Sequence, residues 1–232
     1  MQDTASNVVP TTEKIAIKMG TEVIYKEYYV APRVTKIAGG KGYLFLKRAF
    51  DICASLFAII ILALPMLLLS IAIKIDSKGT VLYKQERLGK DGKPFNVLKF
   101  RSMRMDAESS GAQWAANNDP RVTKMGNFLR KCRLDELPQL FCILGGSMTI
   151  VGPRPERPVF YDEFDKYIDG FRQRLLVKPG LTGLAQVSGG YDLQPEQKIV
   201  YDVEYIENRS VKLDLKVIFA TVAVIFSHNG AR

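Results

Sequence analysis

Residues 52–73 read ICASLFAIIILALPMLLLSIAI and contain no charged side chain. As a helix, this run would extend about 33 Å at roughly 1.5 Å per residue, which is enough to cross the hydrocarbon core of a bilayer. It begins too far into the chain and is too long to be a cleaved signal peptide. A buried core helix is the alternative, although helices of soluble proteins rarely lack a polar face over such a length. The sequence therefore predicts a membrane-inserted helix, which extends over residues 46–78 with its flanks.

Pro65 lies within the apolar run, and both flanks of the run are basic. Proline removes a backbone donor and bends a helix. Lys47 and Arg48 precede the run and Lys74 and Lys78 follow it, whereas a spanning helix usually carries its basic excess on one side. A segment that enters, bends at Pro65 and leaves by the same face would place both flanks on one side. The residues alone leave a spanning helix and a re-entrant helix open.

The composition is that of a folded, basic protein. The chain has 232 residues, of which 47% are hydrophobic and 25% charged, and its formal net charge is +9. A packed domain is expected, with anionic partners such as nucleic acid, acidic lipid or phosphorylated substrates. Cys53, Cys132 and Cys142 form neither a disulfide framework nor a zinc pattern, which fits a reducing, cytoplasmic environment. Because His228 is the only histidine, acid–base chemistry is expected from carboxylates or lysines.

The sequence around the apolar run predicts an α+β fold that is mostly helical. Residues 1–45 are expected to be a flexible tail, and residues 227–232 a second tail. Between the run and the second tail, residues 79–226 are expected to form a cytoplasmic domain. Its predicted elements are a small β-hairpin with strands at 81–85 and 95–100 and an Asp-Gly turn at 89–92, and a polar loop at 106–120.

Several helices are predicted after this loop. Residues 121–133 should be helical in part, residues 136–144 should form a helix that stops at Gly145-Gly146, and residues 196–208 should form another. The spacing of Phe160, Phe164, Ile168, Phe171 and Leu175 predicts one amphipathic helix, which Gly170 weakens. Residues 211–226 are nearly free of polar side chains after Lys216, so this segment is expected either in the membrane interface or packed beneath the domain.

The stretch 133–140, RLDELPQL, places two adjacent carboxylates beside basic residues. The simplest interpretation makes Asp135 a helix N-cap, with Pro138 in the first turn, and Glu136 a favourable charge near the helix dipole. A helix start also attracts phosphate, and neighbouring cations would keep Asp135 ionised. A carboxylate can attack phosphorus to give an acyl phosphate, while Glu136 could position a metal or handle a proton.

Basic residues elsewhere complete a candidate phosphate site. Arg154 lies between two prolines that limit its backbone, and its planar fork matches a phosphate; a surface turn is the plainer interpretation. Lys99 and Arg101 follow a predicted strand and alternate onto one face, although a solvated charged face would show the same spacing. Mg²⁺ is the metal expected with Asp135 and Glu136, because it takes few protein carboxylates and shares phosphate oxygens with the substrate.

Four segments occur in an order that resembles the bacterial sugar transferase family, the monotopic phosphoglycosyl transferases. They are KFRSM at 99–103, RLDELPQL at 133–140, VGPRP at 151–155 and KPGLTGLAQV at 178–187. The resemblance covers roughly residues 46–226. It implies transfer of a sugar-1-phosphate from a UDP-sugar to undecaprenyl phosphate at the cytoplasmic face of the bacterial inner membrane. The product would be a lipid-linked diphosphosugar that starts polysaccharide or glycoconjugate synthesis.

The resemblance also implies roles for individual residues. Asp135 would be the nucleophile of a covalent phosphosugar intermediate, Glu136 its catalytic partner, and Arg154 a phosphate ligand. The membrane element would be a re-entrant helix broken at Pro65. Further substrate contacts are expected from Arg130 and Arg133. Gln186 and Asp202 are also candidates; turn structure is the alternative for Gln186, and a structural hydrogen bond is the alternative for Asp202.

Other expectations concern the chain as a whole. Relative to larger members of the family, the chain is expected to be a minimal catalytic form. It departs from the common pattern at Leu64, Phe141 and Cys142, which is not expected to remove activity. The rival hypothesis is a non-enzymatic membrane protein whose basic face binds anionic lipid or a partner protein; nucleic acid is not an expected partner. Homodimer formation stays open.

Overall fold

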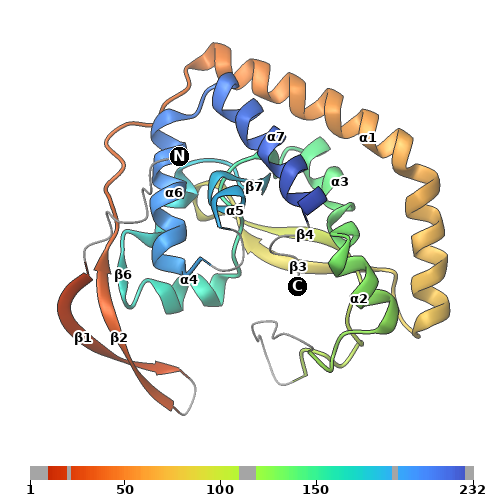
Figure 1. Cartoon of the computed structure of the whole chain (residues 1–232), viewed down its shortest axis with the longest axis horizontal. Coiled ribbons are helices and arrows are strands. Elements are labelled where there is room, and N and C mark those ends of the chain that lie inside the picture. The colour runs from red at the N-terminus through yellow and green to blue at the C-terminus, as the bar shows by residue number, and fades with distance from the viewer. Residues whose placement is uncertain (1–9, 20–21, 110–118, 190–192, 228–232) are drawn as a thin grey trace.

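The computed structural model describes residues 10–19, 22–109, 119–189 and 193–227. Its fold is mixed α and β and 54% helical, so the predicted mostly helical α+β class is confirmed at that level. The largest element is helix α1, Lys41–Asp76, which contains Pro65. Figure 1 shows α1 running along one edge of the molecule and then bending round its side. Within the described residues, α1 alone is long and apolar enough to cross a membrane, and only 6% of its most apolar stretch is buried.

Polar contacts attach the first turns of α1 to the domain. Asp51 is 3% exposed and accepts hydrogen bonds from Thr149 Oγ1 at 2.7 Å and Ile150 N at 2.9 Å. Arg48 donates to the carbonyl oxygens of Ile143 and Leu144 at 2.7 and 2.8 Å. A buried carboxylate with satisfied hydrogen bonds holds its element in one place, because losing the contacts would leave buried donors unpaired.

Polar contacts also attach the last turn of α1 to the same domain. Arg101, just after strand β4, is 4% exposed and donates to the carbonyl oxygens of Ser77 and Lys78 at 2.7 and 2.8 Å. Asp76 accepts from Met125 N at 3.2 Å. The carbonyls at a helix end lack intrahelical donors, so a guanidinium is a suitable cap. The two ends of α1 are therefore bound to one body.

The predicted β-hairpin is present as β3, Leu82–Leu88, and β4, Pro94–Phe100, paired antiparallel. Its turn includes a short 3₁₀ segment, Lys90–Gly92. Asp91 and Gly92 both have positive φ, +58° and +73°, which explains the Asp-Gly pair, since Asp and Gly adopt the left-handed region at low cost. Tyr83 pairs with Lys99 and Arg87 with Phe95 across the hairpin.

The predicted flexible tail over 1–45 is wrong where the structure describes it as strand. Strands β1, Pro10–Met19, and β2, Glu22–Val30, pair antiparallel, and β2 adds the two-residue strand β6, Ile168–Asp169, in parallel. Ile15, Ile17 and Met19 alternate with the small Ala16 and the charged Lys18, which is the period-2 signal of a strand. Residues 1–9 lie outside the described chain.

The predicted helix over Phe160–Leu175 is also wrong. The chain forms α4, Pro158–Phe164, then β6, then a 3₁₀ segment η4, Phe171–Leu176. Helix α4 ends at Phe164, the chain is extended at β6, and Gly170, with φ +86°, directly precedes η4. The five apolar residues nevertheless belong to one buried cluster, so their burial was predicted correctly and their secondary structure was not.

The remaining elements follow the expected order. Helices α2, Lys124–Lys131, and α3, Gln139–Leu144, frame the acid pair. Strands β5, Thr149–Val151, and β7, Gly180–Thr182, pair in parallel, and α5, Leu184–Ser188, follows. The helices α6, Pro195–Asn208, and α7, Val211–Ser227, confirm the predictions for 196–208 and 211–226. Of the predicted loop at 106–120, residues 110–118 lie outside the described chain, as does His228.

Helix α7 packs against the domain by one face and leaves the other face exposed. Val217 is 1% exposed and packs in the cluster around Tyr205, so this face of α7 covers the domain. Its other face leaves a stripe of large apolar side chains exposed: Val211, Leu215, Phe219 and Val222. The spacing of these residues is that of one helical face. The stripe is suited to an apolar surface such as the membrane interface.

Candidate active site

The acid pair lies in a tight turn that precedes α3. Arg133 has φ +56°, and a 3₁₀ segment, Leu134–Glu136, follows it. Helix α3 begins only at Gln139, after Pro138, and neither of these turns has a side-chain cap. The interpretation of Asp135 as a helix N-cap is therefore wrong: the left-handed Arg133 starts a turn before the helix, and this turn orients both carboxylates.

Glu136 is held by two cations from other segments. Arg154 contacts both of its carboxylate oxygens, Nη1 lying 3.3 Å from Oε2 and Nη2 close to Oε1. Lys99 Nζ lies 3.7 Å from Oε1. Burial alone would raise the pKa of Glu136, but the charges of Arg154 and Lys99 outweigh it and lower the pKa to about 2. Glu136 is thus a permanent anion at neutral pH.

Asp135 has the opposite character. Burial, and next the charge of Glu136, raise its pKa to about 6, against the opposing charges of Lys99, Arg130 and Arg154. Adjacent carboxylates whose environments separate their pKa values are suited to different tasks. Asp135 is mostly ionised at neutral pH, yet it is less stabilised as an anion than Glu136, which is the property expected of a nucleophile.

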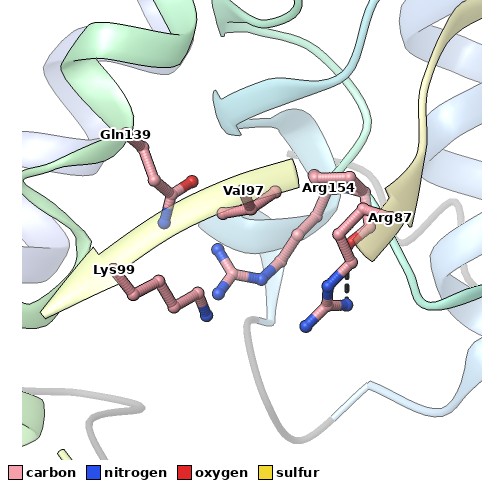
Figure 2. A pocket seen from close by; sticks show the side chains of 6 residues that line it. Arg87, Val97, Lys99, Gln139 and Arg154 are labelled. Atoms are coloured by element: carbon pink, nitrogen blue, oxygen red, sulfur yellow. Dashed lines mark hydrogen bonds between the residues drawn. The ribbon is translucent and has the colours of Figure 1, made fainter. Parts of the chain in front are cut away.

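A small pocket opens beside this pair, lined by Arg87, Val97, Lys99, Gln139, Arg154 and Pro155. Figure 2 shows the polar ends of Lys99, Arg154 and Gln139 pointing into one region, with Arg87 at its side. Three of the six lining residues are cationic, so the pocket favours an anion. The structure thus brings together Lys99, Glu136 and Arg154, which are distant in the sequence.

The Pro153-Arg154-Pro155 segment is fixed by two further arginines. Arg174 Nη2 donates to the carbonyl oxygen of Arg154 at 3.0 Å, and Arg87 Nη1 donates to that of Pro155 at 3.0 Å. Arg174 in turn pairs with Asp202 at 2.7 Å, with both side chains 2% exposed. These bonds, together with the prolines, set the position of the Arg154 guanidinium.

Two predicted substrate ligands have structural partners instead. Asp202 is occupied by Arg174 in the buried pair, where burial raises its pKa despite that partner. Arg101 is buried at the end of α1, so the alternation that puts Lys99 and Arg101 on one face does not carry Arg101 to the pocket. The structural alternative is thus favoured for Asp202, and the expected phosphate contact of Arg101 is corrected, because the neighbours of each residue are not specified by sequence spacing.

Three further predicted substrate-binding residues do not line the pocket. Arg130 and Arg133 are near enough for their charges to lower the pKa of Asp135 and Glu136 respectively, and Arg130 Nε donates to Ser102 Oγ at 2.9 Å. Gln186 donates to the carbonyl oxygen of Leu181 at 3.0 Å and is absent from the pocket lining. Their substrate contacts stay predictions.

The sequence reasoning missed Arg87 and Gln139. Arg87 lies on β3, on the hairpin face that also carries Val97 and Lys99. The alternation of side chains along the predicted hairpin was the available signal for this placement. Gln139 follows Glu136 by three residues, a spacing that brings side chains to one face of a helical turn.

A sequence model of the family described as "Bacterial sugar transferase" matches residues 42–228. The chain is 43% identical over 193 residues to a UDP-N-acetylgalactosamine-undecaprenyl-phosphate N-acetylgalactosaminephosphotransferase of Aeromonas hydrophila, covering 82% of this chain and 46% of the relative. It is 41% identical over 191 residues to a UDP-glucose:undecaprenyl-phosphate glucose-1-phosphate transferase of Escherichia coli, covering 80% and 41%.

The alignment with a third relative extends over nearly the whole chain. The UDP-galactose-lipid carrier transferase of Erwinia amylovora is 35% identical over an alignment of 242 positions that covers 97% of this chain and 50% of the relative. The chain thus spans half or less of the length of these three relatives. The family match covers far more than half of the chain, including every segment of the pocket, and on this ground the chain belongs to the bacterial sugar transferase family.

Proposed function

We propose that the protein transfers a sugar-1-phosphate from a UDP-sugar to undecaprenyl phosphate. The observation that carries the proposal is the acid pair at the edge of a cationic pocket, where the pKa of Asp135 is raised and the pKa of Glu136 is lowered. The names of the relatives supply the two substrate classes. They differ in the sugar, so the sugar of this chain is left open.

In the first half-reaction, an Asp135 carboxylate oxygen attacks the phosphorus that bears the sugar. The new oxygen–phosphorus bond forms as the bond to the bridging oxygen breaks, and UMP leaves with that oxygen and its electron pair. Arg154 and Lys99 are placed to stabilise the charge on the transferring phosphoryl group, a principal contribution to phosphoryl transfer. The result is a phosphosugar joined to Asp135.

In the second half-reaction, a phosphate oxygen of undecaprenyl phosphate attacks the same phosphorus. The bond to Asp135 breaks, and its electron pair returns to the carboxylate. The same cations serve both steps, because the phosphorus stays in one pocket while its partners change. Glu136 keeps Arg154 and Lys99 aligned, and its low pKa prevents it from competing for the proton of an incoming group.

The donor set near the acid pair fits Mg²⁺. Among the described residues no group of three or more His, Cys, Asp or Glu side chains could hold a metal, and Mg²⁺ requires only one or two carboxylates when phosphate oxygens complete its shell. Asp135 and Glu136 are the residues that would hold it. When bound, the ion would neutralise charge on the diphosphate as it develops.

We also propose that α1 is re-entrant and that the domain lies on the cytoplasmic face. The attachment of both ends of α1 to one domain supports this, through Asp51 at the start and Arg101 at the end. A straight spanning helix would separate these ends by the bilayer. The exposed stripe on α7 would lie against the lipid, close to the acceptor.

Labelling from one side of the membrane tests this topology. Single cysteines at Lys41 and Lys78, both exposed, are introduced in a background in which Cys53 and Cys132 are serine. A membrane-impermeant maleimide should label both sites in inverted inner-membrane vesicles and neither in intact cells. Labelling of one site from the outside would show that α1 spans the bilayer.

UMP release across a panel of UDP-sugars tests the activity. The full chain in lipid nanodiscs with Mg²⁺ and undecaprenyl phosphate should release UMP with UDP-glucose, UDP-galactose or UDP-N-acetylgalactosamine, and the lipid product should appear in equal amount. A basic protein that only binds anionic lipid would release none with any sugar.

The first half-reaction should depend on pH through Asp135. Its pKa is raised from 3.8 to about 6, so the nucleophilic anion is present above about pH 6 and is lost as the pH falls through that value. The single-turnover rate of UMP release without acceptor should therefore be level above about pH 7 and fall about tenfold per unit below about pH 6. Omitting undecaprenyl phosphate removes the titration of the acceptor.

Glu136→Gln is the matched variant for this profile. Because the charge of Glu136 helps to raise the pKa of Asp135, the midpoint of the residual activity should move to lower pH. A wild-type midpoint near the ordinary Asp value, or no movement in Glu136→Gln, would contradict Asp135 as the titrating group.

A further inference from the structure

Gln139 is a buried polar residue at the edge of the pocket. It is the first residue of α3 and is 2% exposed. Its side-chain nitrogen Nε2 is buried and has no hydrogen-bond partner within the described part of the chain. A buried donor without a partner is destabilising, and such groups in folded proteins call for an explanation.

The surroundings of this amide explain what would satisfy it. The polar groups that line the pocket with it are the guanidinium groups of Arg87 and Arg154 and the ammonium of Lys99, all of which are donors. Figure 2 shows Gln139 and Lys99 on one side of the pocket and Arg154 opposite, with their polar ends converging. Four donors around one space select a ligand rich in acceptors, and the three positive charges require it to be an anion.

Gln139 differs from the cations in how it is satisfied before a ligand arrives. Arg154 and Lys99 pair with Glu136, and Arg87 pairs with Glu156 at 3.1 Å and with the carbonyl of Pro155. Their charges are thus compensated within the protein. The Nε2 donor of Gln139 gains its partner from the ligand, so its contribution is to binding rather than to folding.

We infer that Gln139 is a substrate-binding residue whose Nε2 donates a hydrogen bond to a non-bridging oxygen of the donor's diphosphate. The inference deepens the proposed function, on which the identity of the ligand rests. A diphosphate supplies the acceptors and negative charge that this lining lacks. A neutral sugar hydroxyl would satisfy the amide but leave the cations without a new partner.

Gln139→Met tests the inference, because methionine has nearly the same shape and no polar donor. The dissociation constant of UDP with Mg²⁺ is measured by titration calorimetry on the full chain in nanodiscs, and thermal unfolding is followed on the same samples. Hydrogen bonds to charged groups are strong enough that Kd for UDP should rise about 10-fold or more. The unfolding temperature should stay the same or rise, because an unpaired buried donor has been removed.

Gln173→Met is a control with the reverse expectation. The Gln173 side chain donates to the carbonyls of Pro32 and Gly170 at 3.1 and 3.0 Å and accepts from Val34 N at 2.6 Å. It lies away from the pocket lining. Its replacement should lower the unfolding temperature and leave the Kd of UDP unchanged.

Gln139→Glu is the second variant and keeps a polar side chain. A carboxylate beside Lys99 and Arg154 should leave the fold stable while repelling the anion, so UDP should bind more weakly than to Gln139→Met. Pyrophosphate with Mg²⁺ is the second probe, and its Kd should rise in parallel. Weaker binding of UDP without weaker binding of pyrophosphate would place the contact off the phosphates and overturn the assignment.

The outcomes separate this inference from the proposed activity. A lower unfolding temperature with unchanged Kd in Gln139→Met would make Gln139 structural and overturn the inference, even if the wild type releases UMP. Conversely, wild type that binds UDP through Gln139 but releases no UMP with any UDP-sugar would contradict the activity and support the binding role.

Discussion

Asp135→Asn is expected to lower UMP release by about 10⁴-fold or more, the scale found when a covalent nucleophile is removed. Asparagine keeps the shape of the side chain but cannot form the acyl phosphate. The fold should not suffer. Because burial raises the pKa of Asp135, the protein favours the uncharged form at this position, and a neutral amide should be tolerated or stabilising. Loss of activity at an unchanged or higher unfolding temperature is therefore the expected combination.

Intact-mass spectrometry gives the direct readout of this variant. Wild-type protein incubated with a UDP-sugar and Mg²⁺, without acceptor, should gain the mass of one sugar phosphate, and Asp135→Asn should gain none. Glu136→Gln is the matched control, since it alters the adjacent carboxylate and should still acquire the adduct, more slowly. Normal UMP release by Asp135→Asn would exclude Asp135 as the nucleophile.

The sequence predicts the elements with strong local signals. The apolar run, the Asp-Gly turn and the helices α6 and α7 each follow from composition and spacing within a short window. The helix expected over Phe160–Leu175 shows the limit of this reasoning. Spacings of three and four residues fit a helix, but α4 ends at Phe164 and the left-handed Gly170 separates β6 from η4. Tertiary packing buries the same side chains from these three separate elements.

The candidate site is predictable only in part for a related reason. The acid pair and Arg154 lie in recognisable motifs, so their identity is visible in the sequence, whereas their partners come from other segments. Arg101 and Lys99 are two residues apart, yet one caps α1 and the other reaches Glu136. Asp202 has a carboxylate that could bind a ligand, but it lies in a buried ion pair with Arg174. Such assignments depend on long-range packing, which local patterns do not contain.

Arg154→Lys is expected to lower the rate of UMP release about 10²- to 10³-fold, the scale for removing a preorganised donor to a developing anion. Lysine keeps the charge but loses the planar fork that contacts both oxygens of Glu136. The backbone should stay in place, because Arg174 and Arg87 hold the carbonyls of residues 154 and 155. The rate should therefore fall with little change in unfolding temperature.

Arg172→Lys is the control for charge-preserving replacement of an arginine. Arg172 is half exposed and pairs with Asp162 and Asp165 on the surface, where ion pairs contribute little, so both rate and stability should be near those of wild type. Equal rates for Arg154→Lys and wild type would show that charge alone is needed at position 154.

Measuring the two half-reactions separately identifies the group that Arg154 contacts. Because the same phosphorus is attacked first by Asp135 and then by the lipid phosphate, a ligand of the transferring phosphoryl group should matter in both steps. UMP release and the discharge of the isolated phosphosugar protein by undecaprenyl phosphate should therefore slow by similar factors in Arg154→Lys. A defect confined to discharge would assign Arg154 to the lipid phosphate, and a defect confined to UMP release would assign it to the leaving nucleotide.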